Sequence, residues 1–265
     1  MHVSALYLHP LKSGRRVALD RAALTERGFA GDRTWMVVRP DGAFLTGREH
    51  PRLTQVAARV EGEDLELSTP GGTVLHVPPP SADAEAVPVR IWGDDVRARA
   101  AGGEADRWLS DTLGFPCRLV RLDPEAPRTV DPTYARPSDT VGFADGFPVL
   151  VTTTASLEAL NARLPEPLAM TRFRPNLVVD GATAFAEDGW RHIRVGETEL
   201  ALVKPCARCV LTTVDPETGE VHPDGEPLRT LATFRRSDRG VLFGQNAIPR
   251  RLGTVRVGDP VEVVE

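Results

Sequence analysis

Short apolar runs, each followed by a turn signal, recur along most of this chain and restrict it to a fold built mainly from β-strands. They are VSALYLH near the N-terminus, then RTWMVVR, DLELST, GTVLHV and DDVRARA, and finally TVRVGDPVEVV near the C-terminus. Turn-forming tripeptides lie between them, for example PDG at 40–42 and PGG at 70–72. Runs of this length and spacing predict strands joined by tight turns.

Helical patterns interrupt the strands at three places. EADRWLSDTLG at 104–114 ends at a glycine, and TTASLEALNARLP at 153–165 places three leucines on one face. Thr154 is the expected N-cap of the second helix and Pro165 its stop. A shorter helix is predicted to begin at Pro227. A majority of strands with a few helices indicates an α+β protein that is predominantly β.

A proline-rich stretch, DPEAPRTVDPTYARPSD at 123–139, divides the chain. With four prolines and little apolar content it is typical of a linker or a long surface loop. At 265 residues the chain is long enough for one large domain or two of ordinary size. We therefore expect two parts, residues 1–122 and residues 123–265.

Charge and composition argue against several classes of protein. The net charge of −5 argues against a general nucleic-acid binder. No run of about 18 apolar residues is present, so we expect no membrane span and no membrane partner. The N-terminus lacks the basic start, apolar core and cleavage site of an export signal. Three cysteines are too few for a disulfide scaffold, and we expect a cytoplasmic protein.

Two of the cysteines, Cys206 and Cys209, lie close together in KPCARCVLTTVDPETGE at 204–220. A redox dithiol needs a helix that begins at the motif, but the residues VLTTV that follow are β-branched and predict a strand. A zinc site needs three or four protein ligands. His222 lies at a suitable sequence distance, but no second histidine follows it, and Cys117 is expected in the core. Neither chemistry fits this context well.

Two interpretations of the pair remain open. The cysteines are small, half-buried thiols at a strand edge without a chemical role. Alternatively, one thiolate binds a soft metal that arrives with its own ligands, as molybdenum does in a pterin dithiolene. The neighbouring Lys204 and Arg208 would favour a thiolate and attract an anion.

Such a cofactor also carries a phosphate, which needs cationic side chains and backbone N–H donors. Four further stretches supply candidates: HPLKSG with Lys12 and Ser13, GDRTW with Arg33, TRFRPN with Arg172 and Arg174, and FGQN with Asn246. Each stretch alone is a weak signal, because an arginine at a strand end is usually solvated. Their occurrence together with the cysteine stretch favours the cofactor.

These motifs resemble the MOSC family, named after the C-terminal domain of molybdenum-cofactor sulfurase, and within it the mitochondrial amidoxime-reducing components and their bacterial relatives. The resemblance runs nearly end to end, through HPLKS, GDRTWMVV, LTGREHPRL, ASLEALNARL, FRPNLVVDG, the cysteine stretch, LFGQN and VRVGDPV. It implies a MOSC β-barrel core in residues 123–265. It also implies an N-terminal, β-barrel-like MOSC-associated α/β subdomain in residues 1–122, whose segment from Lys12 to Arg33 reaches the cofactor.

The resemblance assigns site residues by motif. Cys209 is similar to the family's molybdenum ligand and is the expected catalytic residue, whereas Cys206 matches a frequent cysteine that does not bind the metal. The family positions that bind or line the cofactor site correspond to Lys12, Ser13, Arg33, Asp145, Arg174, Ala207, Arg208 and Asn246. Asn246 stands where the mitochondrial proteins have a tyrosine. Gly146 and Phe147 replace small hydroxyl residues of those proteins, so any cofactor contact there would come from backbone N–H groups.

The resemblance further implies an oxidoreductase with a molybdenum cofactor (Mo-molybdopterin) of the sulfite-oxidase type. Its substrates would be N-hydroxylated compounds (amidoximes, hydroxylamines and N-hydroxylated bases), which lose oxygen in a two-electron reduction. No G-x-G-x-x-G lies between a strand and a helix, and three cysteines cannot supply a four-thiolate iron–sulfur cluster. Electrons would therefore come from a separate donor, a flavin reductase with a ferredoxin or cytochrome. The alternatives are a carrier of persulfide sulfur or molybdopterin, and a cofactor-binding module of a larger assembly.

Overall fold

The computed structural model describes residues 1–126 and 128–265, and within them the chain is an α+β protein in which strands predominate, as the sequence predicts. Its helices are α1 (Gly103–Leu113), α2 (Thr154–Asn161) and α3 (Leu228–Phe234). Four short 3-10 helices also lie in these ranges: η1 (Pro51–Gln55), η2 (Met170–Phe173), η3 (Ala186–Gly189) and η4 (Val210–Thr213). Pro127, within the expected linker, lies outside the described residues.

The strands, in chain order, are β1 (His2–Leu8), β2 (Val17–Leu19), β3 (Arg21–Thr25), β4 (Gly28–Phe29), β5 (Trp35–Val38), β6 (Ala57–Glu61), β7 (Asp64–Ser68), β8 (Leu75–Val77), β9 (Ala86–Ile91), β10 (Asp94–Ala100), β11 (Arg118–Leu122), β12 (Arg128–Thr129), β13 (Thr140–Val141), β14 (Val149–Thr153), β15 (Leu177–Asp180), β16 (His192–Val195), β17 (Thr198–Arg208), β18 (Arg236–Ser237), β19 (Gly240–Arg251), β20 (Gly253–Arg256) and β21 (Val261–Val263).

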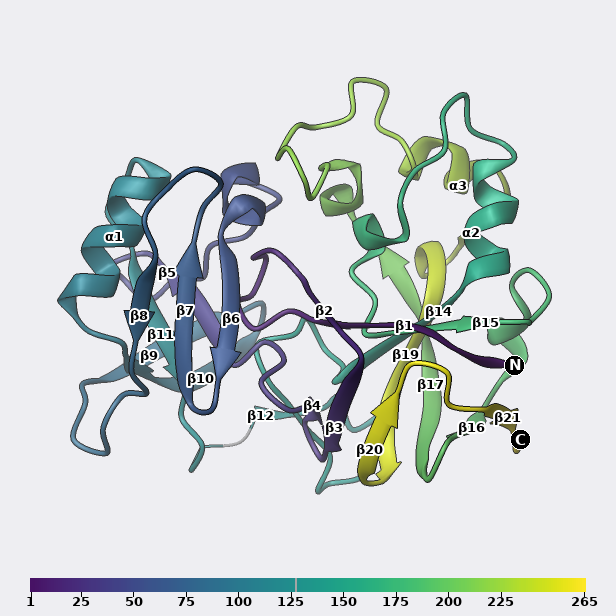
Figure 1. Cartoon of the computed structure of the whole chain (residues 1–265), viewed down its shortest axis with the longest axis horizontal. Coiled ribbons are helices and arrows are strands. Elements are labelled where there is room, and N and C mark those ends of the chain that lie inside the picture. The colour runs from purple at the N-terminus through teal and green to yellow at the C-terminus, as the bar shows by residue number, and fades with distance from the viewer. Residues whose placement is uncertain (127) are drawn as a thin grey trace.

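The largest sheet draws strands from both ends of the chain. Its strand order is β2-β1-β15-β14-β19-β17-β16-β21, and β18 pairs with β19 beside this path. Strand β1 runs antiparallel to β15, with His2 opposite Asp180 and Leu6 opposite Leu177. In Figure 1 the purple β1 accordingly reaches across to the strands of the C-terminal half. The turn that follows β1 is thereby tied to the same sheet as the cysteine stretch on β17.

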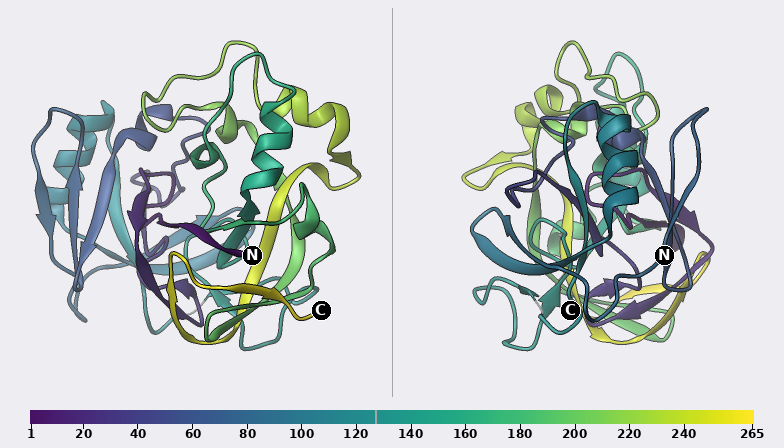
Figure 2. Two further views of the ribbon diagram at one scale, coloured as in Figure 1. Left: turned by 45° about the vertical axis from the view of Figure 1, so that its right-hand side comes forward. Right: turned by 90° about the vertical axis from the view of Figure 1, so that its left-hand side faces the viewer.

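The remaining sheets are smaller. Strands β5-β11-β10-β9 form one sheet and β6-β7-β8 another, and α1 contacts both β11 and β8. Figure 1 and the left-hand view of Figure 2 show these elements gathered on one side of the molecule, beside the large sheet. A third small sheet, β20-β3-β4, pairs N-terminal with C-terminal strands. Backbone pairing therefore crosses the division expected at residue 122.

The three predicted helices are present, but some of their boundaries differ from the predicted ones. Helix α1 ends at Gly114, whose left-handed φ of 84° is readily adopted by glycine. The N-cap of α2 is Thr153 and not Thr154, because the Thr153 backbone is extended and its hydroxyl accepts the Ser156 N–H. Helix α2 ends at Asn161, earlier than expected, where the side-chain amide bonds to the backbone N–H and carbonyl of Leu168. Helix α3 follows Pro227 as predicted.

A hydrophobic cluster under α2 and α3 supports the segment between β14 and β15. Leu160 of α2 and Leu231 of α3 are fully buried in it, together with Phe173 and Phe243, whose rings stack at 3.9 Å between centroids. In Figure 2 the two helices lie together on the same side of the large sheet. Phe173 is the last residue of η2, so this packing fixes the backbone that leads into Arg174. Cys117 is buried in a separate N-terminal cluster, as predicted.

Candidate functional site

A cavity of about 320 Å³ lies where the turn after β1, the loop before β14, η2 and the cysteine stretch meet. Its lining residues are Lys12, Ser13, Arg33, Arg48, Ala144, Asp145, Gly146, Phe147, Leu150, Arg172, Phe173, Arg174, Asn176, Lys204, Pro205, Cys206, Ala207, Arg208, Cys209, Leu211, Thr212 and Asn246. All nine residues that the sequence singles out for the site are in this set. They come from six stretches far apart in the chain, which the fold brings to one cavity.

Three of these nine residues have a backbone conformation that side-chain-bearing residues rarely adopt. Ser13, Arg33 and Arg174 have φ angles of 63°, 47° and 54°. Only two other non-glycine residues of the described ranges, Trp92 and Phe185, have a positive φ. A left-handed conformation costs of order 1 kcal/mol at such residues and persists where the surroundings impose it, often at binding sites. The strained backbone at Ser13, Arg33 and Arg174 therefore lies in three of the segments that the motifs select.

Lys12 and Asp145 form an ion pair at the cavity. The Lys12 ammonium is buried and donates to Asp145 Oδ1 at 2.6 Å and to the carbonyl of Phe143 at 2.8 Å. Arg48 approaches the other carboxylate oxygen at 3.0 Å. Burial lowers the pKa of Lys12, and Asp145 opposes this. Desolvation opposes ionisation of Asp145, but the charges of Lys12 and Arg48 outweigh it and hold the pKa of Asp145 well below its ordinary value.

Arg128 fixes the loop that carries Asp145. Its buried guanidinium donates to the carbonyls of Gly142 at 3.2 Å, Ala144 at 2.5 Å and Asp145 at 3.1 Å. Its Nε also bonds to Asp94 at 2.7 Å. One side chain thus satisfies three buried or half-buried carbonyls of an irregular segment, which gives Asp145 a defined position.

Arg33 is held by a buried carboxylate behind the cavity wall. Its Nη1 pairs with Asp32 and also donates to Asn176 Oδ1 at 3.3 Å, while Nη2 donates to the carbonyl of Arg174 at 3.3 Å. Burial would raise the pKa of Asp32, but the charge of Arg33 and hydrogen bonding with His9 outweigh it and lower this pKa to about 2. The Asp32 carboxylate is therefore ionised at neutral pH, and its ion pair with Arg33 fixes the position of the guanidinium.

His9 lies beside this pair and adds no charge to it. The residue is completely buried, and neither of its ring nitrogens has a hydrogen-bond partner among the described residues. Its Nδ1 lies 3.8 Å from Asp32 Oδ1. Burial, followed by the charges of Arg174 and Arg33, lowers the pKa of His9 well below its ordinary value. Because the His9 imidazole is neutral, Arg33 and Arg174 carry the positive charge on this side of the cavity.

Arg174 has a donor nitrogen without an acceptor among the described residues. Its Nη1 donates to the carbonyl of Gly14 at 2.7 Å, but its buried Nη2 has no partner among the described residues. Burial and the charge of Arg33 lower the pKa of this guanidinium to about 9. A buried donor nitrogen of a cation that lacks an acceptor is costly. An anion in the cavity would relieve that cost, which is the strongest physical indication that the cavity binds one.

The two cysteines of the site differ in their surroundings. Arg208 donates from Nη1 to the sulfur of Cys206 at 2.8 Å and from Nη2 to the carbonyl of Phe173 at 2.6 Å. The sulfur of Cys209 makes no hydrogen bond to the described residues. Both sulfurs are half-buried and neither is in a disulfide. Among the described residues, Cys209 is thus the thiol of the pair whose sulfur no hydrogen bond occupies.

The segment after Cys209 is a short 3-10 helix, η4, and the expectation of a strand there was wrong. Cys209 is its N-cap, with extended φ and ψ of −119° and 176°. The hydroxyls of Thr212 and Thr213 donate back to the carbonyls of Cys209 and Val210 at 2.9 and 2.8 Å. Such local bonds let threonines hold a turn in place of a strand. At four residues, η4 is too short to act as the helix that activates a redox dithiol.

Asn246 and Ala207 are positioned by the pairing of β17 with β19. Asn246 lies opposite Lys204 of β17 and opposite Leu150 of β14, and Ala207 lies opposite Leu242. Gly244 begins this stretch with φ of 77°, and a Cβ there would lie 2.8 Å from the carbonyl of Val151. Only glycine allows that close approach of β14 and β19.

Sequence reasoning missed several cavity residues. Arg48 lies in the motif LTGREHPRL, which was available as a signal, and Asn176 lies in TRFRPN. Arg172, which the sequence offers as a candidate cation for the phosphate, is paired within the protein. It donates to the carbonyl of Thr213 at 3.0 Å and to Asp215 Oδ2 at 2.8 Å, so it ties η2 to the segment after Cys209. Lys204 was noted only as a neighbour of the cysteines.

The donor set fits an anionic group that carries a soft metal. Within residues 1–126 and 128–265, no three His, Cys, Asp or Glu side chains are grouped so as to hold a metal ion. A metal bound by Cys209 would have to bring its remaining ligands with it. The buried Lys12 and the half-buried Arg33 and Arg174 would meet the charge of an attached anion.

Comparison with known proteins agrees with these motifs. Residues 1–116 match the family described as the MOSC N-terminal beta barrel domain, and residues 138–262 match the MOSC domain. The chain is 39% identical to mitochondrial amidoxime-reducing component 1 of Danio rerio, over 98% of this chain and 83% of that protein. It is 35% identical to the Homo sapiens protein of the same name, over 98% and 82%. A crystal structure of the YUAD protein from Bacillus subtilis covers 98% of this chain and 93% of its own at 12% identity, with a TM-score of 0.47.

The helices offer no membrane span. Across the part of the chain that the structure describes, no helix is both long enough and apolar enough to cross a bilayer.

Proposed function

The chain belongs to the MOSC-domain family, and from this membership and the geometry of the cavity we propose that it is a molybdenum-dependent oxidoreductase that reduces N-hydroxylated compounds. The relatives named amidoxime-reducing components support the substrate class, and amidoximes and hydroxylamines are the compounds to test first. We also propose that residues 1–122 and 123–265 are its two family domains, with β1 of the first completing the sheet of the second.

One observation carries the proposal. The residues that the motifs select for a metal and an anion, from six separate stretches, line one cavity. That cavity holds the free thiol of Cys209 and the buried Nη2 of Arg174, which has no hydrogen-bond partner among the described residues. A structural role for the arginines would have paired them internally. The Nη2 of Arg174, which has no partner among the described residues, instead supports an anionic ligand as the missing partner.

The chain's own residues would hold the cofactor as follows. Cys209 would give its thiolate to the metal, while Lys12, Ser13, Arg33 and Arg174 would bind the phosphate and pterin. Ala207, Arg208 and Asn246 would line the rest of the cofactor's surface. When bound, the molybdenum cofactor supplies the two-electron redox chemistry that removes oxygen from nitrogen.

Proton supply follows from the charges at the cavity. Reduction of an N-hydroxyl group to N–H and water consumes two protons along with two electrons. Asp145 is the only carboxyl among the described lining residues, and its lowered pKa keeps it ionised at neutral pH. An ionised carboxylate cannot donate a proton. Asp145 is therefore not the proton donor and serves to hold Lys12 and Arg48.

Electrons are proposed to come from a separate protein, a flavin reductase with a ferredoxin or cytochrome, in the cytoplasm. Docking of such donors is typically transient and small in area.

The test is reduction of benzamidoxime by protein purified from a host that makes molybdopterin. Dithionite-reduced viologen serves as the electron donor, and benzamidine is measured as the product. We expect turnover that depends on molybdenum content and is absent from cofactor-free protein. Cofactor-loaded protein that reduces no amidoxime or hydroxylamine, but carries sulfane sulfur on Cys209, would instead support a sulfur carrier.

A further inference from the structure

Lys204 occupies an unusual place at the cavity. Its ammonium lies over the ring of Tyr134 at 4.5 Å from the centroid and 5.8 Å from the centroid of Phe147. The two rings meet edge to face, with centroids 5.9 Å apart. Lys204 comes from β17, Phe147 from the loop before β14 and Tyr134 from the proline-rich stretch. Three separate segments thus hold one cation at the cavity wall.

This cation has no anionic partner among the described residues. Lys12, the other lysine of the chain, pairs with Asp145 at 2.6 Å. Lys204, in contrast, forms no ion pair and donates no hydrogen bond within the part of the chain that the structure describes. The carboxyl it influences is Asp131, whose pKa is lowered first by hydrogen bonds from Thr133 and only in smaller part by the charge of Lys204.

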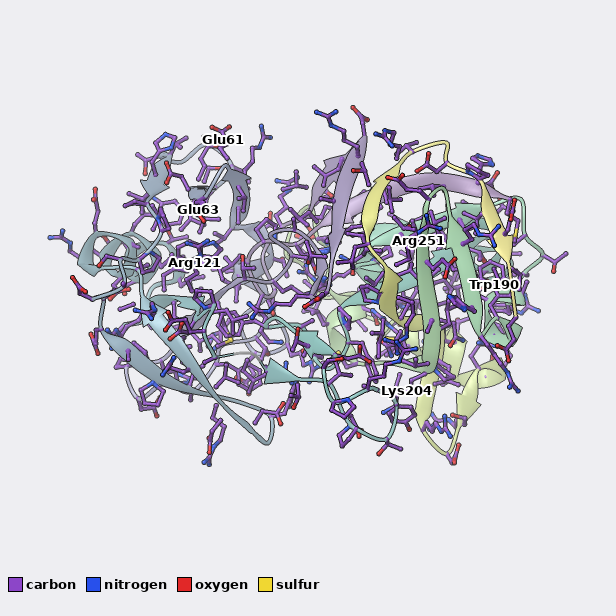
Figure 3. The ribbon with its side chains drawn as sticks, turned by 90° about the horizontal axis from the view of Figure 1, so that it is seen from below. Glu61, Glu63, Arg121, Trp190, Lys204 and Arg251 are labelled. Carbon is purple, nitrogen blue, oxygen red and sulfur yellow. The ribbon has the colours of Figure 1, made fainter. Side chains whose placement is uncertain are left out.

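Lys204 is also separate from the cations proposed to hold the cofactor. Arg33 and Arg174 are joined through the Arg174 carbonyl, and Lys12 joins Arg48 through Asp145. Lys204 contacts none of these groups. In Figure 3 it lies on β17 in the C-terminal half, where its register partner is Asn246. Lys204 is therefore a cation of the cavity that is not assigned to the phosphate or the pterin.

We propose that Lys204, held by Tyr134 and Phe147, forms a subsite for an anionic group of the substrate. The subsite selects N-hydroxylated compounds that carry a carboxylate or a phosphate. This inference rests on the proposed function and assigns the substrate class of the same cavity.

The aromatic pair explains why a lysine here can discriminate between substrates. The rings cover part of the ammonium and fix its position, which limits the loss of side-chain freedom when an anion binds. A cation–π contact leaves the N–H donors on the other side of the nitrogen free for an oxygen acceptor. A charge-assisted hydrogen bond at a partly desolvated site changes affinity by roughly tenfold or more.

The experiment compares matched substrates on the cofactor-loaded protein with reduced viologen as donor. They are benzamidoxime, which is neutral, and its 4-carboxy and 4-phosphono derivatives. We expect kcat/KM to be about tenfold higher for one or both anionic compounds, and this preference to fall as salt is raised. The carboxy and phosphono arms separate the two sources of the anionic group. Lys204→Met should remove the preference and Lys204→Arg should keep most of it.

Arg251→Met is the matched control, because Arg251 is an exposed cation on the neighbouring strand β19 (Figure 3). Its preference should equal that of the wild type. Calorimetric titration of 4-carboxybenzamidoxime without electron donor gives a readout independent of turnover, and Lys204→Met should weaken this binding about tenfold. Equal kcat/KM for neutral and anionic substrates in the wild type would overturn the subsite. Failure to reduce benzamidoxime, with the calorimetric difference intact, would overturn the proposed reaction and leave the subsite standing.

Discussion

Arg208 and Cys206 are joined by a hydrogen bond in which the guanidinium Nη1 donates to Sγ across 2.8 Å. The same guanidinium holds the carbonyl of Phe173, so Cys206 belongs to a contact that links β17 to η2. Cys209, three residues later, has no such contact within the described residues. The structure thereby gives these two thiols different surroundings.

The first prediction concerns these thiols. Cys209→Ser should abolish reduction of benzamidoxime and leave the fold intact, because one half-buried sulfur contributes little to packing. Cys206→Ser should keep much of the activity, since a serine hydroxyl can still accept from Arg208. Turnover and circular dichroism of both variants check this. An active Cys209→Ser beside an inactive Cys206→Ser would reverse the assignment.

The second prediction concerns Arg174. Arg174→Met should lower the molybdenum content of purified protein strongly, because loss of a charge-assisted contact to a desolvated phosphate costs roughly 1.5–3 kcal/mol of binding. The melting temperature of the cofactor-free form should hardly fall, since the variant also removes a buried nitrogen that has no hydrogen-bond partner among the described residues. Arg59→Met, at an exposed position of β6, is the control and should change neither quantity. A large fall in the melting temperature of cofactor-free Arg174→Met would mean that the arginine is structural.

The third prediction concerns Asp32. Its pKa is lowered from 3.8 to about 2, so the ionised group stabilises the fold above the unfolded pKa, and this stability is lost as the pH falls through the folded pKa. Asp32→Asn should therefore reduce the free energy of unfolding by about 2 kcal/mol at pH 7. The deficit should shrink between pH 4 and pH 2. Urea unfolding at several pH values measures it, and a deficit independent of pH would contradict the linkage.

The fourth prediction concerns Glu187, which is completely buried below the start of α2. Burial raises its pKa, although hydroxyls of Ser156 and Thr153 donate to it. The protonated form is thus favoured by folding, and its contribution is full at low pH and lost as the pH rises through the raised pKa. Glu187→Gln should match the wild type near pH 4 and be more stable at pH 8.

The stability gain at pH 8 should be about 1.4 kcal/mol for each unit by which folding raises the pKa of Glu187. Glu158→Gln, at an exposed position of α2, serves as the control and should show no such trend. A Glu187→Gln variant that is less stable at pH 8 than at pH 4, relative to wild type, would contradict the assigned direction.

The fifth prediction concerns electrons. The purified protein should not oxidise NADH or NADPH in the presence of a hydroxylamine, but it should reduce that substrate with reduced viologen. Addition of a flavin reductase and a ferredoxin or cytochrome should restore dependence on NAD(P)H. The absorbance of NADH at fixed protein concentration reports the result. Robust NADH-driven turnover by the isolated chain would reveal an electron-entry site within it.

Local patterns predicted much of this molecule. Alternating strands, the glycine after α1 and the helix after Pro227 follow from short-range rules, and the site residues follow from motifs. The pairing of His2 with Asp180 does not, because no local pattern specifies a contact between residues so far apart. The 3-10 turn after Cys209 was missed because threonine hydroxyls bonded to the backbone and overrode the β-branched preference.

The side-chain contacts that distinguish the cations of the site could not be predicted from local sequence patterns either. Arg48 reaches Asp145, and Lys204 reaches Tyr134, only after the fold has joined distant segments. The sequence could indicate which residues carry charge at the site. It could not indicate which charges are paired within the protein and which are left for a ligand.

We propose that one cavity binds a molybdenum cofactor through Cys209, the buried Lys12 and the half-buried Arg33 and Arg174. The most direct test of this proposal is elemental and pterin analysis of the protein purified from a molybdopterin-producing host. We expect about one molybdenum and one molybdopterin per chain, with Cys209→Ser losing most of the metal and Arg174→Met losing both. Protein that carries zinc, or neither metal nor pterin, after purification from that host would contradict it.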